Sequence, residues 1–118
     1  MSGNSQLGRR GEQIATRWLE EHGYTILERN WRCPRGEIDV VSTIGESIVF
    51  VEVKTRSTLD YGHPFEAITA AKKARLRQLA VMWTTQSTLH SGLLRIDAIG
   101  ILNAWSRTPC IQHLEGIA

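Results

Sequence analysis

Apolar positions between residues 6 and 22 recur at steps of three and four, the spacing of one face of an α-helix. Ser5 stands where an N-cap is expected, and Gly23 follows as the glycine that ends the helix. Glu12 lies one turn from Gly8 and Ala15, so we expect it at the rim of the apolar stripe, near the core but outside its centre. The stripe itself consists of Leu7, Gly11, Ile14, Ala15, Trp18 and Leu19.

After this segment the pattern changes to the two-residue alternation of β-strands. Strands are predicted over residues 24–31, 37–42 and 47–54, with turns at 33–36 and 44–46. Because these connections are short, the three strands are expected to form an antiparallel meander. In the first strand one face is expected to carry Tyr24, Ile26 and Glu28.

A polar loop is expected from residue 55 to 64, followed by a second helix from Ala67 to about Gln86 with Thr69 as a candidate cap. A loop over 87–92 leads to a strand over 93–102, which should pair in parallel with the third strand through a right-handed crossover. A short strand near 110–114 completes the sheet. The second helix is expected to present Ile68, Ala71, Leu76, Leu79, Ala80 and Trp83 to the core. The predicted order, α-β-β-β-α-β-(β), is an α/β fold with a mixed central sheet flanked by helices.

Composition narrows the class of protein. The chain has 118 residues, 42% of them hydrophobic and 22% charged, which fits a single globular domain over residues 1–118. No apolar run is long enough for a membrane span, and the first ten residues lack a secretory signal, so we expect a cytoplasmic protein. The two cysteines are expected to be free thiols, and zinc is disfavoured. The net charge of +2 permits nucleic-acid binding without arguing strongly for it.

Candidate chemistry lies on the second and third strands. Alternation places Glu52 and Lys54 on one face of the third strand, and Glu37, Asp39 and Val41 on one face of the second. If the strands pair, Asp39 meets Glu52 across the ladder. Carboxylate oxygens suit Mg²⁺, and a neighbouring lysine can orient a water and stabilise developing charge. The backbone carbonyl between Glu52 and Lys54, that of Val53, is a further candidate metal ligand.

The ExK triplet has plainer interpretations. With each charged type at about 6%, such a triplet arises by chance about 0.4 times in a chain of this length. Glu52 and Lys54 could form a solvated strand face, and a structural ion pair between Asp39 and Lys54 is the strongest alternative. An exposed glutamate at the helix rim is the corresponding alternative for Glu12.

Several segments together resemble a known family. GEID at 36–39 and FVEVKTRS at 50–57 resemble the PD-(D/E)xK nuclease signature, with Ile38 in place of its proline. The segments GRRGEQIATRWLEEHGY, ILERNWRC, YGHP and RIDAIGI resemble the YraN-like family of bacterial proteins, so that the resemblance runs from about Gly8 to Gly100. It implies a restriction-endonuclease-like αβββαβ core. It also implies Asp39, Glu52 and Lys54 as catalytic residues, with Glu12 matching the helix acid of archaeal Holliday-junction resolvases.

Other residues are candidates for supporting roles. Glu37 is expected to support the metal ligands as a neighbouring carboxylate or to be a metal ligand itself, and the alternative is an exposed residue beside Arg35. Candidate phosphate contacts are Arg35, Thr55, Arg56, Lys72 and Lys73. The two lysines sit at a helix N-terminus, where the helix dipole disfavours cations, and this favours a phosphate-binding role. Arg75 is expected on the solvated face of the helix.

Three hypotheses follow. The first is an Mg²⁺- or Mn²⁺-dependent endonuclease, with branched or structured DNA favoured over RNA. The second is a module that binds nucleic acid or a partner protein with little or no catalysis. The third is a domain whose charged cluster is only a structural ion pair. Because nucleases that cut two strands are often two-fold dimers, a homodimer is an open alternative.

Overall fold

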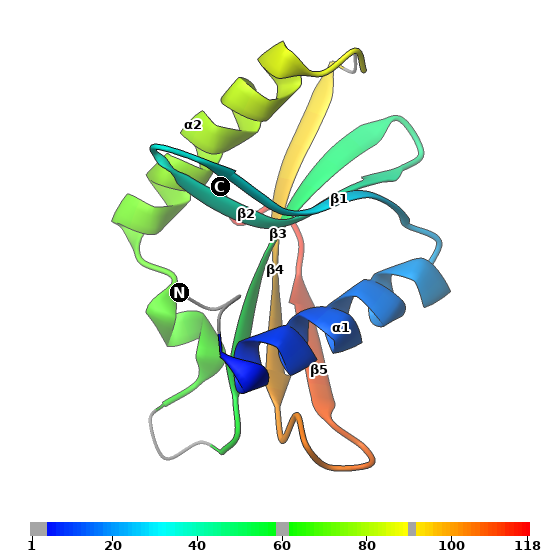
Figure 1. Ribbon diagram of the computed structural model, residues 1–118, viewed down its shortest axis with the longest axis vertical. Helices are drawn as coiled ribbons and strands as arrows, with labels where there is room; N and C mark the ends of the chain where they lie inside the picture. Colours follow the sequence, from blue (N-terminus) through cyan, green and yellow to red (C-terminus); the bar gives the residue numbers. More distant parts are fainter. Residues whose placement is uncertain (1–4, 59–61, 90–91) are drawn as a thin grey trace.

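The computed structural model describes residues 5–58, 62–89 and 92–118. Within these residues, two α-helices and five strands follow one another in the predicted order, with one short 3₁₀ helix before the second α-helix (Figure 1). In chain order these are α1 (Gln6–Glu21), β1 (Thr25–Cys33), β2 (Gly36–Ile44), β3 (Ser47–Arg56), η2 (Pro64–Ala67), α2 (Ala70–Gln86), β4 (Leu93–Leu102) and β5 (Cys110–Leu114).

The strands form one mixed sheet in the order β1-β2-β3-β4-β5. The first three make the antiparallel meander that the short turns predicted, and β4 pairs in parallel with β3. β5 adds an antiparallel edge strand beside β4. The α/β fold with a mixed sheet is therefore confirmed, and it is consistent with a restriction-endonuclease-like core.

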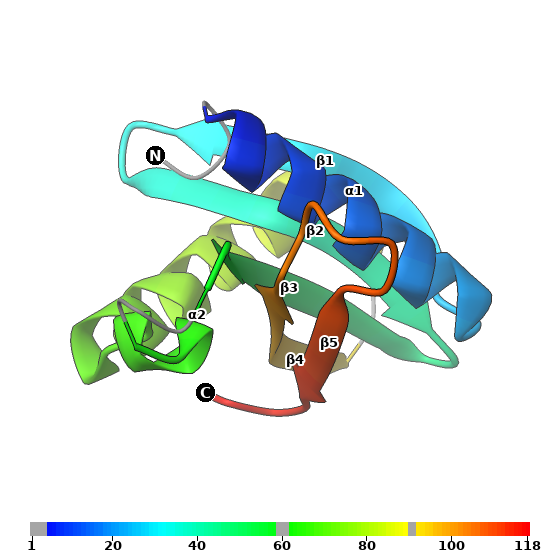
Figure 2. The ribbon, with the colours of Figure 1, turned by 90° about the horizontal axis from the view of Figure 1, so that it is seen from below.

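The two helices cover opposite faces of this sheet, as Figure 2 shows from below. One group of buried apolar side chains packs between α1 and the sheet, and a second packs between α2 and the sheet. On β3 these groups alternate: Val49, Val51 and Val53 face α1, while Ile48 and Phe50 face α2. Burial on both faces explains why this strand is almost continuously apolar.

The ends of the helices are set by local capping. Ser5 Oγ accepts a hydrogen bond of 2.8 Å from the amide of Gly8, and Gly23 adopts a φ of +90° after the last turn of α1. Thr69 caps α2, accepting from the amide of Lys72 at 3.2 Å. The second helix therefore begins at Ala70 rather than at Ala67, because a separate 3₁₀ turn ends at Ala67 and the chain then becomes extended before the Thr69 cap.

Two residues expected on the apolar face of the second helix lie elsewhere. Ile68 precedes α2, and Ala71 is exposed on it. The expected side of Glu28 is also wrong, because the register between β1 and β2 shifts between Ile26 and Glu28. Ile26 packs on the α1 side, whereas Glu28 accepts a hydrogen bond from Trp83 of α2 at 3.0 Å. A β-bulge of this kind reverses the alternation of the residues that follow it.

The predicted loops over 55–64 and 87–92 contain residues outside the described part of the chain. At the first of them β3 continues to Arg56, so the strand is longer than predicted. Cys33 and Cys110 are free, as expected. Within the described residues no helix combines the length and the apolarity that crossing a bilayer requires.

Candidate active site

Glu52 and Lys54 project together from the C-terminal half of β3. They continue the row of Ile48 and Phe50, so they lie on the α2 side of the sheet. Lys54 Nζ lies 3.3 Å from Glu52 Oε1, and both side chains are largely buried, with 13% and 12% of their surface exposed. This ion pair joins two residues of the same strand, and their burial excludes a freely solvated strand face.

Asp39 contacts β3 through its side chain and not, as predicted, as the ladder partner of Glu52. Pairing between β2 and β3 ends at Val40 and Val51, so Asp39 and Glu52 are not partners in the ladder. Instead Asp39 Oδ2 accepts a hydrogen bond of 2.8 Å from the amide of Val53. The carboxylate satisfies a backbone donor that the missing ladder partner would otherwise leave unpaired.

This bond also orients the carbonyl of Val53. In an extended strand the N–H and C=O of one residue point to the same side. Since the amide of Val53 points to Asp39, its carbonyl points toward β2 as well, at the level where the β2–β3 ladder has ended. The predicted backbone ligand therefore faces the same space as the carboxylate of Asp39.

Where the pairing of β2 with β3 ends, the backbone of β2 and that of β1 are both irregular. Ile38 and Val41 both pack on the α2 side and Val40 on the α1 side, so the strict alternation that placed Glu37, Asp39 and Val41 on one face does not hold across Asp39. Asn30, which lies opposite Asp39 between two paired positions, has a φ of 54°. Asparagine is one of the few residues that enter this left-handed region readily.

Glu12 of α1 is part of the same cluster. Only 1% of its surface is exposed, so the expectation of a helix-rim residue and the alternative of a solvated glutamate are both wrong. Its carboxyl is hydrogen-bonded by the side chain of Asn30, while Oε2 is buried without a hydrogen-bond partner. The neighbouring Gly11 explains the burial: a Cβ there would lie 1.8 Å from Thr55 Oγ1, so only glycine lets α1 approach the end of β3 this closely.

The environment disfavours negative charge on all three acids. Burial, followed by the charge of Glu52, raises the pKa of Asp39 well above its usual range. Burial also raises the pKa of Glu52, although the ammonium of Lys54 opposes the shift. Burial is again the largest cause for Glu12, whose pKa is raised despite its hydrogen bond with Asn30. Such a group of carboxylates favours the binding of a cation or of protons.

Two lysines meet beside these acids. The side chain of Lys72, from the first turn of α2, lies beside that of Lys54. Burial lowers the pKa of Lys54, but contacts with Lys72 and Glu52 outweigh it and the net shift is upward. The pKa of Lys72 is lowered, chiefly by its contact with Lys54. The upward shift favours a charged Lys54 among the carboxylates, and the downward shift disfavours a second positive charge on Lys72.

An open pocket of 440 Å³ adjoins Glu52 and Lys54, and we call it the carboxylate pocket. Its lining consists of Arg32, Cys33, Pro34, Gly36 and Glu37 from the β1–β2 hairpin, Glu52 and Lys54 from β3, and Lys72, Arg75, Leu76 and Leu79 from α2. Glu37 lies 3.2 Å from Arg32 and acts electrostatically on Asp39, Glu52 and Glu12. This position suits a carboxylate that supports the other acids.

The residues predicted to contact phosphates do not all lie at one place in the structure. Lys72 lines the carboxylate pocket, while Thr55 and Arg56 line a second hollow of 300 Å³ with Lys54 and the start of α1. Lys54 thus lines both hollows. Arg35 is exposed at the hairpin turn, and Lys73 lies beside Lys72 without lining either hollow. Arg75, expected in solvent, is exposed but borders the carboxylate pocket.

Sequence reasoning missed Asn30, Arg32 and the contact of Gly11 with Thr55. Asn30 carried a usable signal, since asparagine is enriched where a backbone turns left-handed. Arg32 faces Glu37 across the hairpin, a register position that could be inferred only after the turn was placed.

The donors fit a divalent cation that shares its coordination with a substrate. Across residues 5–58, 62–89 and 92–118, no three His, Cys, Asp or Glu side chains are gathered tightly enough to hold a metal by themselves. Mg²⁺ requires no closed protein cage, since one or two carboxylates, waters and substrate phosphates usually bind it. The unpartnered Oε2 of Glu12 and the Val53 carbonyl, which points to the same side as the amide bound by Asp39, add oxygen donors to Asp39 and Glu52.

Comparison with known proteins identifies the family. The profile of the uncharacterised protein family UPF0102 matches residues 11–101 of the chain. The UPF0102 protein of Leifsonia xyli subsp. xyli is 56% identical over 117 residues, covering 99% of both chains. The UPF0102 proteins of Beutenbergia cavernae and Paenarthrobacter aurescens are each 47% identical over 117 residues, which is 99% of this chain. The match covers 99% of the first relative and 97% of the second. The chain belongs to the UPF0102 family. The resemblance to YraN-like proteins is thereby confirmed at the level of the family.

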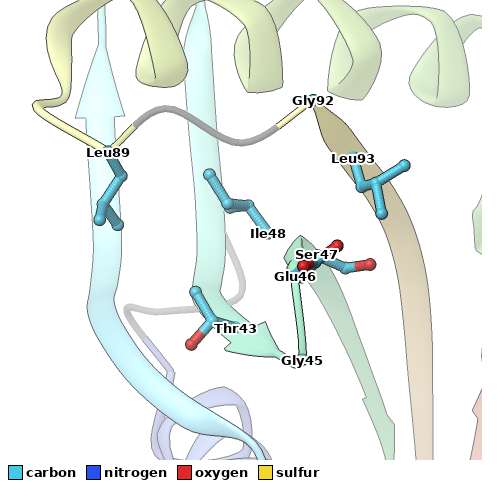
Figure 3. A pocket seen from close by; sticks show the side chains of 8 residues that line it. All are labelled: Thr43, Gly45, Glu46, Ser47, Ile48, Leu89, Gly92 and Leu93. Carbon is cyan, nitrogen blue, oxygen red and sulfur yellow. The ribbon is translucent and has the colours of Figure 1, made fainter.

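A further hollow of this UPF0102 protein lies far from the acids. It has a volume of 670 Å³ and surrounds the β2–β3 turn and the start of β4 (Figure 3). The apolar side chains of Ile48, Leu89 and Leu93 lie around it, together with Glu46 and Ser47. Because this end of β3 is opposite to the end that carries Lys54, the hollow is separate from the candidate site.

The raised pKa of Asp39 predicts an unusual response of the UPF0102 protein to mutation. The pKa of Asp39 in the folded protein lies above its unfolded value of 3.8. Asp39 therefore contributes fully to stability below pH 3.8, and this contribution is lost as the pH rises through the folded pKa. At neutral pH without metal, Asp39→Asn is therefore expected to raise the melting temperature, since its amide oxygen can still accept from Val53.

Thermal unfolding between pH 4 and pH 8 checks this. Mg²⁺ or Mn²⁺ should stabilise the wild type and have little effect on Asp39→Asn, because binding to the folded state alone raises stability. Asp97→Asn serves as a control of opposite sign, since the pKa of Asp97 is lowered. A lower melting temperature for Asp39→Asn at neutral pH would contradict the prediction.

A further buried acid, Asp97 of β4, belongs to a separate network on the α1 side. Arg95 donates to it at 2.9 and 2.8 Å, His113 Nε2 lies 2.7 Å from Oδ2, and the amide of Gly116 donates at 3.0 Å. Arg95 also donates to Tyr24 at 2.7 Å. The contacts of Asp97 with His113 and Gly116 join β4 to β5 and to the C-terminal segment, and the bond from Arg95 to Tyr24 joins β4 to the residue before β1.

Proposed function

We propose that this UPF0102 protein is a metal-dependent endonuclease of the restriction-endonuclease-like superfamily. One observation carries the proposal: Glu12, Asp39 and Glu52 come from three different elements and are buried around the end of one broken strand pair, next to Lys54. Burying three acids in a chain of 118 residues is unfavourable for folding unless they bind something. Phosphodiester hydrolysis uses this combination of acids and a lysine.

Each residue has a role that its position supports. Asp39, Glu52 and the Val53 carbonyl would hold Mg²⁺ or Mn²⁺, which supplies Lewis-acid polarisation of the phosphate and a more acidic water. Lys54, charged and held by Glu52, donates hydrogen bonds to the attacking water or to a phosphoryl oxygen as negative charge develops. Glu12 Oε2 accepts a hydrogen bond from a water at the inner side of the cluster.

The cations around the site support a nucleic acid as the proposed substrate. Arg32, Lys72 and Arg75 border the carboxylate pocket on one side of Lys54, and Arg56 borders the hollow on the other. Phosphates on either side of the scissile bond would meet these groups. Structured or branched DNA, cleaved in the cytoplasm, is the proposed substrate class, and a homodimer would let two sites act on paired strands.

A panel of labelled nucleic acids tests the proposal. Single strand, duplex, flap, four-way junction and structured RNA are incubated with Mg²⁺, Mn²⁺ or chelator, and products are resolved on denaturing gels. We expect cleavage that requires metal and that Glu52→Gln abolishes, because the substitution removes the charge beside Lys54. Glu20→Gln, at an exposed position of α1, is the matched control and should cleave like the wild type.

The second candidate is a binding module without turnover. The lack of a tight group of three metal-ligating side chains in the described part of the chain favours it. It predicts salt-sensitive band shifts on the same panel that survive Glu52→Gln, with no products under any metal. That result would overturn the nuclease proposal and leave the nucleic-acid interface standing.

A further inference from the structure

The carboxylate pocket has an apolar wall that phosphodiester chemistry does not need. Cys33 and Pro34 of the hairpin line it together with the buried Leu76 and Leu79 of α2, and Cys33 packs against the cluster that contains both leucines. Gly36 brings the two elements together, since a Cβ there would lie 3.3 Å from Leu79 Cδ1. A surface that only held the backbone of a duplex would require cations and reach, not an apolar hollow.

The remainder of the pocket is charged and mostly positive. Its lining contains four cations, Arg32, Lys54, Lys72 and Arg75, against two carboxylates, Glu37 and Glu52. The carboxylates lie with Lys54 near the end of β3, where the proposed scissile phosphate binds. An apolar wall beside a cationic border matches a nucleotide, which has flat apolar base faces and an anionic phosphate.

From this arrangement we propose that the carboxylate pocket binds the base of an unpaired nucleotide adjacent to the scissile phosphate. In a duplex both faces of a base are stacked, so a base reaches such a wall only when it is single-stranded, at a frayed end or flipped out. The volume of 440 Å³ lies within the roughly 300–1,000 Å³ typical of small-ligand pockets. This inference rests on the proposed function and adds a substrate class: strands with an unpaired nucleotide at the cut.

A protein side chain is the competing occupant of an apolar pocket. The cations at its border favour the nucleotide, because a hydrophobic anchor from a partner protein would leave Lys72 and Arg75 without complementary charge on that anchor. A nucleotide also accounts for the position of the pocket, because Glu52 and Lys54 are part of its lining.

Binding to abasic oligonucleotides tests the inference without any cleavage. Wild-type protein in chelator is titrated, by fluorescence anisotropy, with a single-stranded eight-nucleotide DNA, its duplex, and a series of single strands carrying one abasic position each. We expect the intact single strand to bind more tightly than the duplex. One abasic position should weaken binding about tenfold, as loss of one stacked base does. An equal affinity across the series, or a duplex that binds as tightly as the strand, would overturn the inference.

Cys33 provides a second, local readout. This free thiol lines the pocket, whereas the free thiol of Cys110 lies on β5 and serves as an internal reference. Alkylation of each cysteine is followed by mass spectrometry with and without saturating oligonucleotide. The intact single strand should slow alkylation of Cys33 and leave Cys110 unchanged, and the strand with the critical abasic position should protect Cys33 less. Alkylation of Cys33 at the same rate with and without the bound strand would contradict occupancy of the pocket.

The two proposals fail in distinguishable ways. Protection of Cys33 together with a position-dependent abasic effect, but without cleavage under any metal, would keep the base pocket and overturn the nuclease. Metal-dependent cleavage of a fully paired duplex with a flat abasic series would keep the nuclease and overturn the base pocket.

Discussion

Replacing Lys54 by methionine is expected to lower the rate of metal-dependent cleavage at saturating substrate about 100- to 1,000-fold, the usual cost of losing one charge-stabilising donor. Methionine keeps much of the length of the side chain and removes the ammonium that lies 3.3 Å from Glu52. The proposed donor to the attacking water and to the phosphoryl oxygens is then lost, while Asp39 and Glu52 are unchanged in sequence. Single-turnover kinetics on the best substrate of the panel measure the change.

Affinity separates a catalytic role from a binding role. In chelator the Lys54→Met variant should bind the same substrate within about tenfold of the wild type, since Arg32, Lys72 and Arg75 still border the pocket. Because Lys72 contacts Lys54, it can supply part of the lost charge. The double variant Lys54→Met/Lys72→Met should therefore be slower than either single variant. Full activity of the single variant with a folded protein would show that Lys54 is not a catalytic residue.

Replacing Asp97 by alanine is expected to lower the free energy of unfolding by about 3–5 kcal/mol, the range for removing one partner from a buried charge network. Asp97 is fully buried, with 0% of its surface exposed, and it accepts from Arg95 and from the amide of Gly116. Without the carboxylate these donors lose a buried acceptor, and His113 loses its partner at 2.7 Å. Urea denaturation at neutral pH measures the loss.

Glu115→Ala is the matched control, because Glu115 pairs with the same arginine. Its carboxylate lies 3.7 Å from Arg95 and 62% of its side chain is exposed, so its removal should cost less than about 1 kcal/mol. Equal losses for Asp97→Ala and Glu115→Ala would show that the network contributes little.

The pH dependence of the Asp97 effect has a definite sign. Burial raises the pKa of Asp97, but hydrogen bonds from His113 and Arg95 outweigh it and hold the pKa below the usual value of 3.8. A lowered folded pKa gives a contribution to stability that is present above 3.8 and lost as the pH falls through the folded value. The difference between the wild type and Asp97→Ala should therefore shrink in strong acid. Asp39 acts in the opposite direction above pH 3.8, so the metal-free protein should be most stable in mild acid.

Much of the fold follows from local patterns in the sequence. The spacing of apolar residues and the cap at Ser5 determined α1, because helical periodicity and capping depend on neighbours within a few positions. Alternation and short turns determined the β1–β2–β3 meander and the projection of Glu52 and Lys54 from one face of β3. The helix between β3 and β4 determined that these two strands run parallel.

The tertiary structure decided how the candidate site is assembled. The alternation of side chains predicted the wrong face for Glu28 and did not hold across Asp39. A β-bulge and the end of a strand pair depend on the partner strand, so they leave no periodic signal in the sequence of one strand. Glu12 is buried because Gly11 allows α1 to lie against Thr55, a contact between residues 44 positions apart. The apolar wall of the carboxylate pocket joins the hairpin to α2 in the same way. The sequence by itself therefore determined which acids and which lysine are candidates for the site and on which elements they lie. Only the packing of distant segments decided which of them are buried together, because burial and charge depend on all neighbours in space.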